Sequence, residues 1–387
     1  MQIYLDYSAT TPTHPLVLER MRQVCAEEWG NPSSLHRWGN RSATLLEMAR
    51  MQVAGLIGAA NPDNLVFTAG GTEADNLAIF GIINRCDRPQ HLIISSVEHP
   101  AVAKPADFLE KKGWQVTRLP VDQFGRVNPQ DLEQAIQPNT VLISIIYGQS
   151  EVGTIQPIQE LGAIARKNNI LFHTDAVQVA GRIPINVSEL PVDLLSLSSH
   201  KIYGLQGTGA LYIRDGLELA PMIFGGGQEG ALRSGTQSIP GIVAFGMAAE
   251  LAEENLGTES QRLLELRELF FAKMADCEHL EITGDRHHRL PHHTSFSIKP
   301  NSPLLGITGK TIVRQMNLAG IGMSAGSACH SGALNPSLIL KAMGYSNQTA
   351  LSGIRLTFGG ETQVEDIEWT AIALRQILQR QRFLLFA

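Results

Sequence analysis

The chain has 387 residues, of which 43% are hydrophobic and 18% charged, and its formal net charge is −6. These values are typical of a soluble globular protein of two domains, and they argue against a nucleic-acid or anionic-membrane surface. No apolar run is long enough to cross a bilayer and no secretory pattern opens the sequence, so we expect a cytoplasmic protein without a membrane partner. The four cysteines are Cys25, Cys86, Cys277 and Cys329. Their wide spacing excludes a disulfide framework and a zinc motif, and cysteines without disulfides suit a reducing compartment.

Short apolar segments alternate with helical patterns between residues 42 and 213. The segments are unbroken and rich in Val, Ile and Leu, which is typical of strands covered on both faces. Strands are expected at 65–68, 92–95, 141–146, 170–173, 194–198 and 210–213, and helices near 46–57 and 157–168. This alternation predicts an α/β fold with a mostly parallel sheet.

The pattern changes near residue 260. A charged helix is predicted at 259–275, then a strand at 294–298, a loop at 324–335 and an amphipathic helix at 364–380. We therefore expect residues 15–258 to form a large α/β domain. Residues 1–14 and 259–387 are expected to form a smaller α+β domain that carries the loop 324–335.

A glycine turn follows the predicted strand at 65–68, where Ala69-Gly-Gly-Thr-Glu opens an apolar helix. Glycines at such a turn let backbone N–H groups approach an anion, and Thr72 would add a hydroxyl. The segment lacks the Walker lysine and the dinucleotide spacing, so neither of those nucleotide motifs is favoured. A turn in which a threonine caps the helix is the alternative explanation of the same residues.

Asp175 and Lys201 each lie at the end of a predicted strand. Ligands of open α/β sheets bind beyond the carboxyl ends of strands, so both side chains are candidates for a cofactor site. Pyridoxal phosphate (PLP) requires a lysine that holds its aldehyde and an aspartate that keeps its pyridine nitrogen protonated. A single lysine is more often a solvated surface charge, so the prediction depends on its combination with Asp175 and the glycine turn.

Histidine and arginine residues supply further candidates. His99 follows another strand and could stack on a flat ring. Arg355 lies in an apolar strand and would need a partner such as a substrate carboxylate. The histidines at 287, 288, 292 and 293 suggest a metal cluster, but adjacent pairs rarely converge on one ion and no carboxylate has ligand spacing. We therefore expect no metal site.

Cys329 lies within Ser324-Ala-Gly-Ser-Ala-Cys-His-Ser-Gly, where nearly all side chains are small. Such a segment has little to bury, so a mobile loop is predicted. A thiol on this loop is a candidate for a nucleophile that moves, and a Gly/Ser linker with an incidental cysteine is the alternative. His330 could help to form the thiolate, or could lie beside it by chance.

Taken together, these residues resemble a cysteine desulfurase of the NifS/IscS group, within the fold-type I PLP enzymes and the class-V aminotransferase family. The resemblance runs from Tyr4 to Asp366. Its most specific motifs are Gly30-Asn-Pro-Ser-Ser-Leu-His, Gly70-Gly-Thr-Glu-Ala-Asp-Asn-Leu, Ser199-His-Lys-Ile-Tyr-Gly and Arg233-Ser-Gly-Thr. The cysteine loop matches the long-loop form of the group. The resemblance implies conversion of L-cysteine to L-alanine, with the sulfur held on Cys329 as a persulfide for iron–sulfur clusters or other acceptors.

The resemblance also implies residue roles. Asp175 would pair with the pyridine nitrogen, Gln178 would contact the ring hydroxyl, and Lys201 would bind the cofactor covalently and move the Cα proton. The implied catalytic residues are Lys201, Cys329 and His99. The implied cofactor-binding residues are Gly71, Thr72, His99, Ser150, Asp175, Gln178, Ser198, His200, Lys201 and, from the other subunit of a homodimer, Thr236. The implied substrate-binding residues are Arg355 and Ser150.

One motif departs from the family. Relatives have Asn-Asn-Glu where this chain has Gln149-Ser150-Glu151, so the contact made by the family asparagine falls on Ser150. A serine reaches less far than a carboxamide, and a water could fill the gap. Relatives with a longer C-terminal tail use it to dock a scaffold protein. This chain has little beyond its last predicted helix, so that partner is not carried over, and an iron–sulfur scaffold is only one of the conceivable sulfur acceptors.

Two other functions are consistent with the sequence. A PLP-dependent C–S lyase or selenocysteine lyase would use the same cofactor residues and rely little on Cys329. β-Elimination would release pyruvate and ammonia, whereas desulfuration releases alanine. A non-catalytic module that binds a phosphorylated ligand at the glycine turn is the third alternative.

Overall fold

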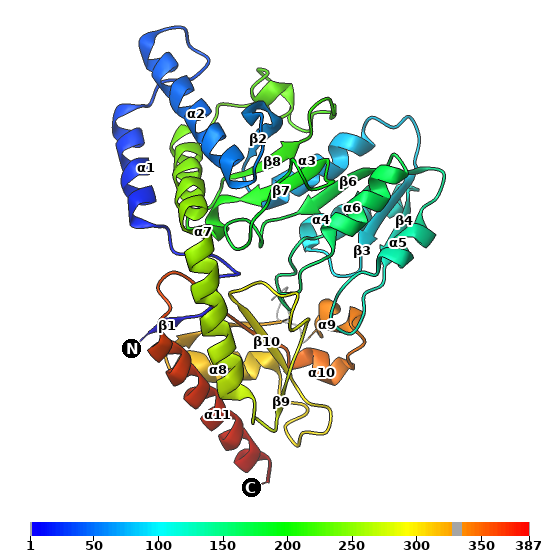
Figure 1. Cartoon of the computed structure of the whole chain (residues 1–387), viewed down its shortest axis with the longest axis vertical. Coiled ribbons are helices and arrows are strands. Elements are labelled where there is room, and N and C mark those ends of the chain that lie inside the picture. The colour runs from blue at the N-terminus through cyan, green and yellow to red at the C-terminus, as the bar shows by residue number, and fades with distance from the viewer. Residues whose placement is uncertain (1, 327–334, 387) are drawn as a thin grey trace.

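The computed structural model describes residues 2–326 and 335–386. Its largest sheet has seven strands in the order β2(Leu65–Thr68), β8(Gly209–Ile213), β7(Leu194–Ser198), β6(Leu171–Asp175), β5(Thr140–Ser144), β3(His91–Ser95) and β4(Gln115–Leu119) (Figure 1). β8 is antiparallel to both of its neighbours, and the other pairs are parallel. The carboxyl ends of six strands therefore meet at one edge. The predicted α/β fold with a mostly parallel sheet is confirmed.

Helices cover both faces of this sheet. Successive side chains of a strand point to opposite faces, and in β3 Ile93 packs in one core while Leu92 and Ile94 pack in the other. One face is covered by α1(Pro15–Glu27), α2(Arg37–Leu56), α5(Pro129–Ala135), α6(Ile158–Lys167) and the first half of α7(Ile239–Met274). The other face is covered by α3(Gly71–Ile83) and α4(Pro100–Lys111). This double cover explains why the strands read as continuous apolar runs.

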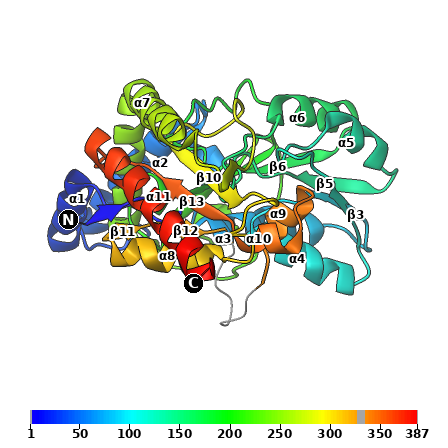
Figure 2. The same ribbon diagram turned by 90° about the horizontal axis from the view of Figure 1, so that it is seen from below.

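A separate core joins the first residues of the chain to its C-terminal third. It contains the antiparallel sheet β12(Ser324–Ala325), β13(Ile354–Thr357), β10(His293–Ile298) and β9(Leu280–Ile282), and the parallel pair β1(Ile3–Tyr4) and β11(Ile321–Gly322). The helices α8(Gly309–Leu318) and α11(Val364–Phe386) pack on it side by side (Figure 2). Two short helices, α9(Leu338–Ala342) and α10(Asn347–Leu351), pack beside Val152.

The long helix α7 differs from the prediction. The sequence predicted a helix from residue 259, whereas α7 begins at Ile239 and runs through both parts of the molecule (Figure 1). Ile242, Phe245 and Ala248 are buried in the first half of α7. A helix that is apolar on most sides lacks the one-sided period by which a helix is found in a sequence. The domain boundary predicted at residues 258/259 falls inside this helix.

The predicted loop 324–335 begins as a strand, because Ser324 and Ala325 pair with β13. Residues 327–334, with Cys329, lie outside the described residues. The described part of the chain also has three 3₁₀ helices: η1(Pro62–Asn64), η2(Ser199–Lys201) and η3(Glu229–Ala231). Within residues 2–326 and 335–386, every helix is too short or too polar to span a membrane.

Candidate functional site

A cavity of about 790 Å³ lies at the edge where the strands of the large sheet end. The turn after β2 and the start of α3 form one wall, and the end of β7 with η2 forms another. Four of the predicted cofactor-binding residues line it: Gly71, Thr72, Ser198 and His200. Open α/β folds bind ligands at such an edge. The topology therefore brings these four residues, from two distant segments, to one ligand-sized space.

The N-terminus of α3 supplies an anion site on this cavity. Its cap residue is Gly70 rather than Thr72, and its φ of +149° is one that residues with a Cβ rarely adopt. Glycine offers no side-chain cap, so N–H groups of the first turn remain for a ligand. The positive end of the helix dipole favours an anion there. Glu73, on the same turn, is paired with Arg233 at 2.8 Å.

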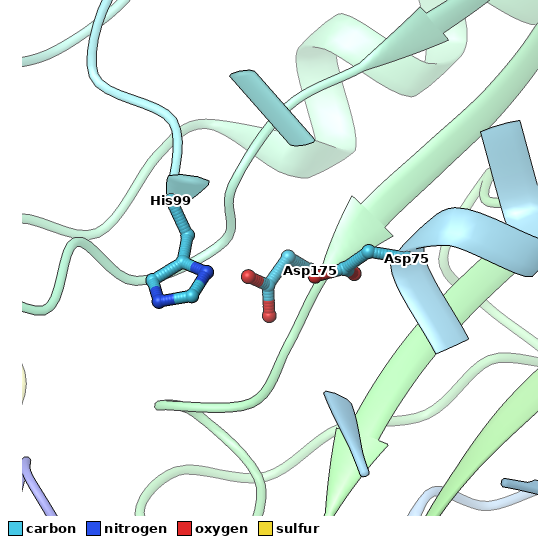
Figure 3. Close-up of side chains that lie close together, drawn as sticks. All are labelled: Asp75, His99 and Asp175. Atoms are coloured by element: carbon cyan, nitrogen blue, oxygen red, sulfur yellow. The ribbon is translucent and has the colours of Figure 1, made fainter. Parts of the chain in front are cut away.

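Asp175, His99 and Asp75 lie together beyond β6 (Figure 3). A ring nitrogen of His99 and one carboxylate oxygen from each aspartate are all within 4.8 Å of one another. Both aspartates are buried, whereas His99 is exposed at the start of α4. The Oδ1 atom of Asp175 accepts a hydrogen bond from the backbone N–H of Val177 at 2.9 Å. A carboxylate and an imidazole in this arrangement can hold a flat, cationic ring between them.

The amine of Lys201 approaches the N-terminal segment of the chain. Its Nζ donates hydrogen bonds to the carbonyl oxygens of Ser8 at 2.6 Å and Ala9 at 2.8 Å, and Ala9 lines the cavity. Burial and the cation of Arg355 lower the pKa of Lys201 to about 8, against the pull of nearby carboxylates. A lower pKa leaves more neutral amine at neutral pH, and the neutral amine is the form that attacks an aldehyde.

Arg355, in β13, contacts two distant segments of the chain. Its Nη2 donates to Oδ1 of Asp6 at 2.7 Å, and its Nη1 donates to the carbonyl oxygen of Ser150 at 2.9 Å. Asp6 also accepts a hydrogen bond from the hydroxyl of Ser324 at 2.8 Å. The buried Nε of Arg355 has no hydrogen-bond partner among the described residues. The guanidinium is therefore held at two of its nitrogens and keeps other N–H donors, that of Nε among them, for a further acceptor.

Both polar atoms of the Gln149 side chain form hydrogen bonds with backbone groups. Its Oε1 accepts hydrogen bonds from two backbone N–H groups of that turn, and its Nε2 donates to the carbonyl oxygen of Val97 at 3.4 Å. The carbonyl oxygen of Ser150 binds Arg355 and lies 3.0 Å from Nε2 of His293. Both polar atoms of the Gln149 side chain are therefore engaged within the protein. The contact to cofactor and substrate that was expected of Ser150 stays a prediction.

The remaining predicted residues lie in different places. Gln178 is buried, and its Nε2 donates to the carbonyl oxygen of Ser8 at 2.9 Å, the same oxygen that Lys201 contacts. Thr236 is exposed and does not line the cavity of its own chain. Cys329 lies outside the described residues. Within the part of the chain that the structure describes, the one group with metal-ligand geometry is the trio in Figure 3, not the histidines near residue 290.

Sequence reasoning missed Asp6, Asp75 and Glu98. Glu98 is buried, and its Oε1 accepts hydrogen bonds from the backbone N–H of Ile146 at 2.9 Å and from the hydroxyl of Ser95. These bonds join the start of α4 to the end of β5 and so hold the segment that carries His99. An acidic residue directly before His99 was the signal available in the sequence.

We expect the stability of the protein to fall between about pH 4.5 and 8 in part because of Glu98. Burial raises the pKa of Glu98 from 4.5 to about 8 in the folded protein. Between these pH values the unfolded chain releases the proton and the folded chain keeps it, so the free energy of unfolding decreases as pH rises. Glu98→Gln stays neutral and should show a smaller fall. Thermal unfolding midpoints at pH 5 and pH 8 measure this, with the exposed Glu160→Gln as the control. Equal falls in wild type and Glu98→Gln would contradict the assignment.

Comparisons with known proteins agree on one family. Residues 3–369 match the aminotransferase class-V family. The chain is 44% identical over 383 residues to a cysteine desulfurase IscS from Dictyoglomus turgidum, and this alignment covers 98% of this chain and 95% of the relative. A NifS-like protein superimposes with a TM-score of 0.91 at 34% identity, covering 98% of this chain and 100% of the other. SspA in complex with cysteine gives a TM-score of 0.81 at 35% identity, covering 92% and 99%.

Proposed function

The chain belongs to the aminotransferase class-V family and is a PLP-dependent cysteine desulfurase, and we propose that Lys201, Asp175 and Cys329 carry this activity. The observation that best supports the proposal is the amine of Lys201, with its lowered pKa, beside the carboxylate of Asp175 and an uncapped helix N-terminus. This combination provides the three groups that hold the aldehyde, the ring nitrogen and the phosphate of PLP.

The residues at the sheet edge fit this cofactor. Open space surrounds Gly70, where no atom lies within 4 Å of the position of a Cβ, so a phosphate can approach the first N–H groups of α3. The exposed imidazole of His99 would lie against the ring, and Asp175 would face the ring nitrogen. When bound, PLP supplies an aldehyde that holds the substrate amino group and a ring that withdraws electrons from Cα.

The chain's own groups divide the remaining work. Asp175 keeps a negative charge opposite the ring nitrogen, and Lys201 holds the cofactor and moves the proton at the substrate Cα. Arg355 receives the substrate carboxylate, while its bond to Asp6 keeps the guanidinium in place. Gln178 and Ser150 complete the contacts to the ring and to the substrate.

Cys329 is the proposed sulfur acceptor, on the basis of the sequence resemblance. Its thiolate attacks the substrate sulfur, so that an S–S bond forms while the Cβ–S bond breaks and Cβ takes up a proton. The products are alanine and a persulfide on Cys329, and no oxidant or reductant is consumed. The persulfide then passes its sulfur to an acceptor protein, such as one that builds iron–sulfur clusters. The free thiols at Cys25, Cys86 and Cys277 suit a reducing cytoplasm.

Product analysis tests this function against the lyase alternatives. With L-cysteine and a reductant, we expect equal amounts of alanine and sulfide and no pyruvate. Pyruvate with ammonia would instead support a C–S lyase. A purified protein that holds no PLP and turns over no cysteine would support the phosphate-binding module.

We expect the protein to be a homodimer, because Thr236 is proposed to complete the phosphate site of the neighbouring subunit. The chain also exposes large apolar side chains, with Leu35 96% and Phe224 81% accessible, and such side chains mark interaction surfaces when they gather. In sedimentation at assay concentration, Leu35→Asp with Phe224→Asp should shift the protein toward monomer and lower its PLP content. Trp369→Ala, at an exposed site on α11, is the control. A fully active wild-type monomer would contradict the proposal.

A further inference from the structure

Asp75 is a buried carboxyl group that none of the roles above uses. It lies on the second turn of α3, is 1% exposed and points toward Asp175 (Figure 3). Within residues 2–326 and 335–386 its Oδ1 has no hydrogen-bond partner, and Nε2 of His173 is 3.6 Å away. Oxygen atoms of Asp75 and Asp175 lie within 4.8 Å of each other. Two carboxylates this close in a protein interior cannot both ionise cheaply unless a cation compensates them.

His173 does not supply that cation. Its Nδ1 lies 2.8 Å from the hydroxyl of Ser144, and its Nε2 lies 3.0 Å from the hydroxyl of Ser196. Both ring nitrogens thus have neutral partners, and burial lowers the pKa of His173 to about 3. The pKa of His99 is lowered too, because its ring nitrogens are partly withdrawn from water although the residue reaches the surface, and because Lys201 is nearby. Neither imidazole therefore compensates Asp75, and one of the two carboxyl groups is expected to carry a proton.

The surroundings of the two carboxyl groups decide where the proton lies. Burial raises the pKa of Asp175, but the N–H of Val177, which it accepts, and the charge of Lys201 oppose this and favour its ionised form. Among the described residues, only the hydroxyl of Ser196 acts on Asp75 in this way, and burial and the neighbouring charge of Asp175 raise the pKa of Asp75 well above its usual value. A hydrogen bond to an ionised form stabilises that form, so Asp175 is the group that keeps the charge.

We propose that Asp75 is a positioning residue that stays a neutral carboxylic acid and acts as a hydrogen-bond donor toward the carboxylate of Asp175. It thereby limits the pair to one negative charge and orients that charge toward the ring nitrogen of the cofactor. The inference rests on the proposed role of Asp175. Ser196 and His173 complete the polar surroundings of the pair.

Two replacements of similar size separate a neutral donor from an ionised group. Asp75→Asn keeps an uncharged donor, whereas Asp75→Leu has none. Ser144→Ala, which alters the far side of His173, is the control for damage to the buried polar network. The measurements on the full chain with PLP are kcat, the pH dependence of the visible absorbance of the cofactor, and the infrared absorbance of protonated carboxyl groups at neutral pH.

We expect Asp75→Asn to keep kcat within about threefold and to keep the absorbance titration of wild type. Asp75→Leu should bind PLP, shift that titration and lose roughly 10²-fold in kcat, as when a preorganised donor is removed. Buried Glu98, with a pKa of about 8, also gives a protonated-carboxyl band at neutral pH. The infrared difference from wild type should therefore show the loss of one such band, that of Asp75, in both Asp75 variants and no loss in Ser144→Ala.

Two results would overturn the inference: an Asp75→Asn variant as impaired as Asp75→Leu, or an infrared band unchanged in Asp75→Asn. The infrared difference between wild type and Asp75→Asn is also measured after removal of PLP, where it reports the protonation of the pair without any contribution from the cofactor. Full turnover in Asp175→Ala would instead disprove the proposed role of Asp175, and the two failures are thereby told apart.

Discussion

Lys201→Ala is expected to abolish both turnover of L-cysteine and covalent attachment of PLP. The amine is the group of η2 whose pKa burial lowers to about 8, and its hydrogen bonds to Ser8 and Ala9 hold it beside the cavity. Without this amine the cofactor is not covalently bound and no group moves the Cα proton, so kcat should fall by more than about 10³-fold.

The α3 N-terminus and Asp175 remain in Lys201→Ala, so non-covalent PLP binding should persist at lower affinity. Borohydride reduction followed by intact mass determination distinguishes the two forms of binding. Lys104→Ala, an exposed lysine paired with Asp107, should keep the covalent cofactor and full turnover. A Lys201→Ala protein that still yields a borohydride-fixed cofactor would show that another residue holds the aldehyde.

Cys329→Ala is expected to bind PLP normally and to make no alanine from L-cysteine. A thiol reacts as its thiolate, and an unperturbed cysteine, with a pKa of about 8.5, is only slightly ionised at neutral pH. Attack on the substrate sulfur needs near-contact geometry, so the thiol must reach the substrate in a docked state. Alanine formation should therefore fall to background, while the absorbance change on adding L-cysteine remains.

The other three cysteines provide the matched control for Cys329. Cys25 is exposed, Cys86 is half-buried and Cys277 is buried, and none lines the cavity. Replacement of all three by Ala should leave alanine production near that of wild type. If Cys329→Ala keeps most of its alanine production, the nucleophile is elsewhere and the lyase alternative gains support.

Local sequence patterns predicted six of the seven strands of the large sheet and the residues at the strand ends, but not β4, whose burial pattern is mostly exposed or intermediate. The runs at 65–68 and 194–198 are β2 and β7 as the structure has them, because unbroken apolar segments belong in a doubly covered sheet. Asp175 ends β6, and Lys201 follows β7 within η2. The position of a chemical motif at a strand end was therefore enough to assign it to the ligand-binding edge of the sheet.

Contacts between distant segments could not be predicted in the same way. Asp6 binds Arg355 across 349 positions, and Ser8 accepts hydrogen bonds from both Gln178 and Lys201. No local period encodes such pairs, since they depend on how β1 and β13 pack after folding. Asp75 was hidden for a related reason: at the start of α3 it is one of several polar residues, beside Thr72, Glu73 and Asn76, and only the position of Asp175 distinguishes it.

Mass spectrometry of peptides from the wild-type holoenzyme, after brief incubation with L-cysteine and without reductant, tests the central claim most directly. We predict one additional sulfur on the peptide that contains Cys329, none on the peptides of Cys25, Cys86 and Cys277, and one alanine released for each sulfur bound. Alanine release with no sulfur on Cys329, or with the sulfur on another cysteine, would contradict the proposed transfer.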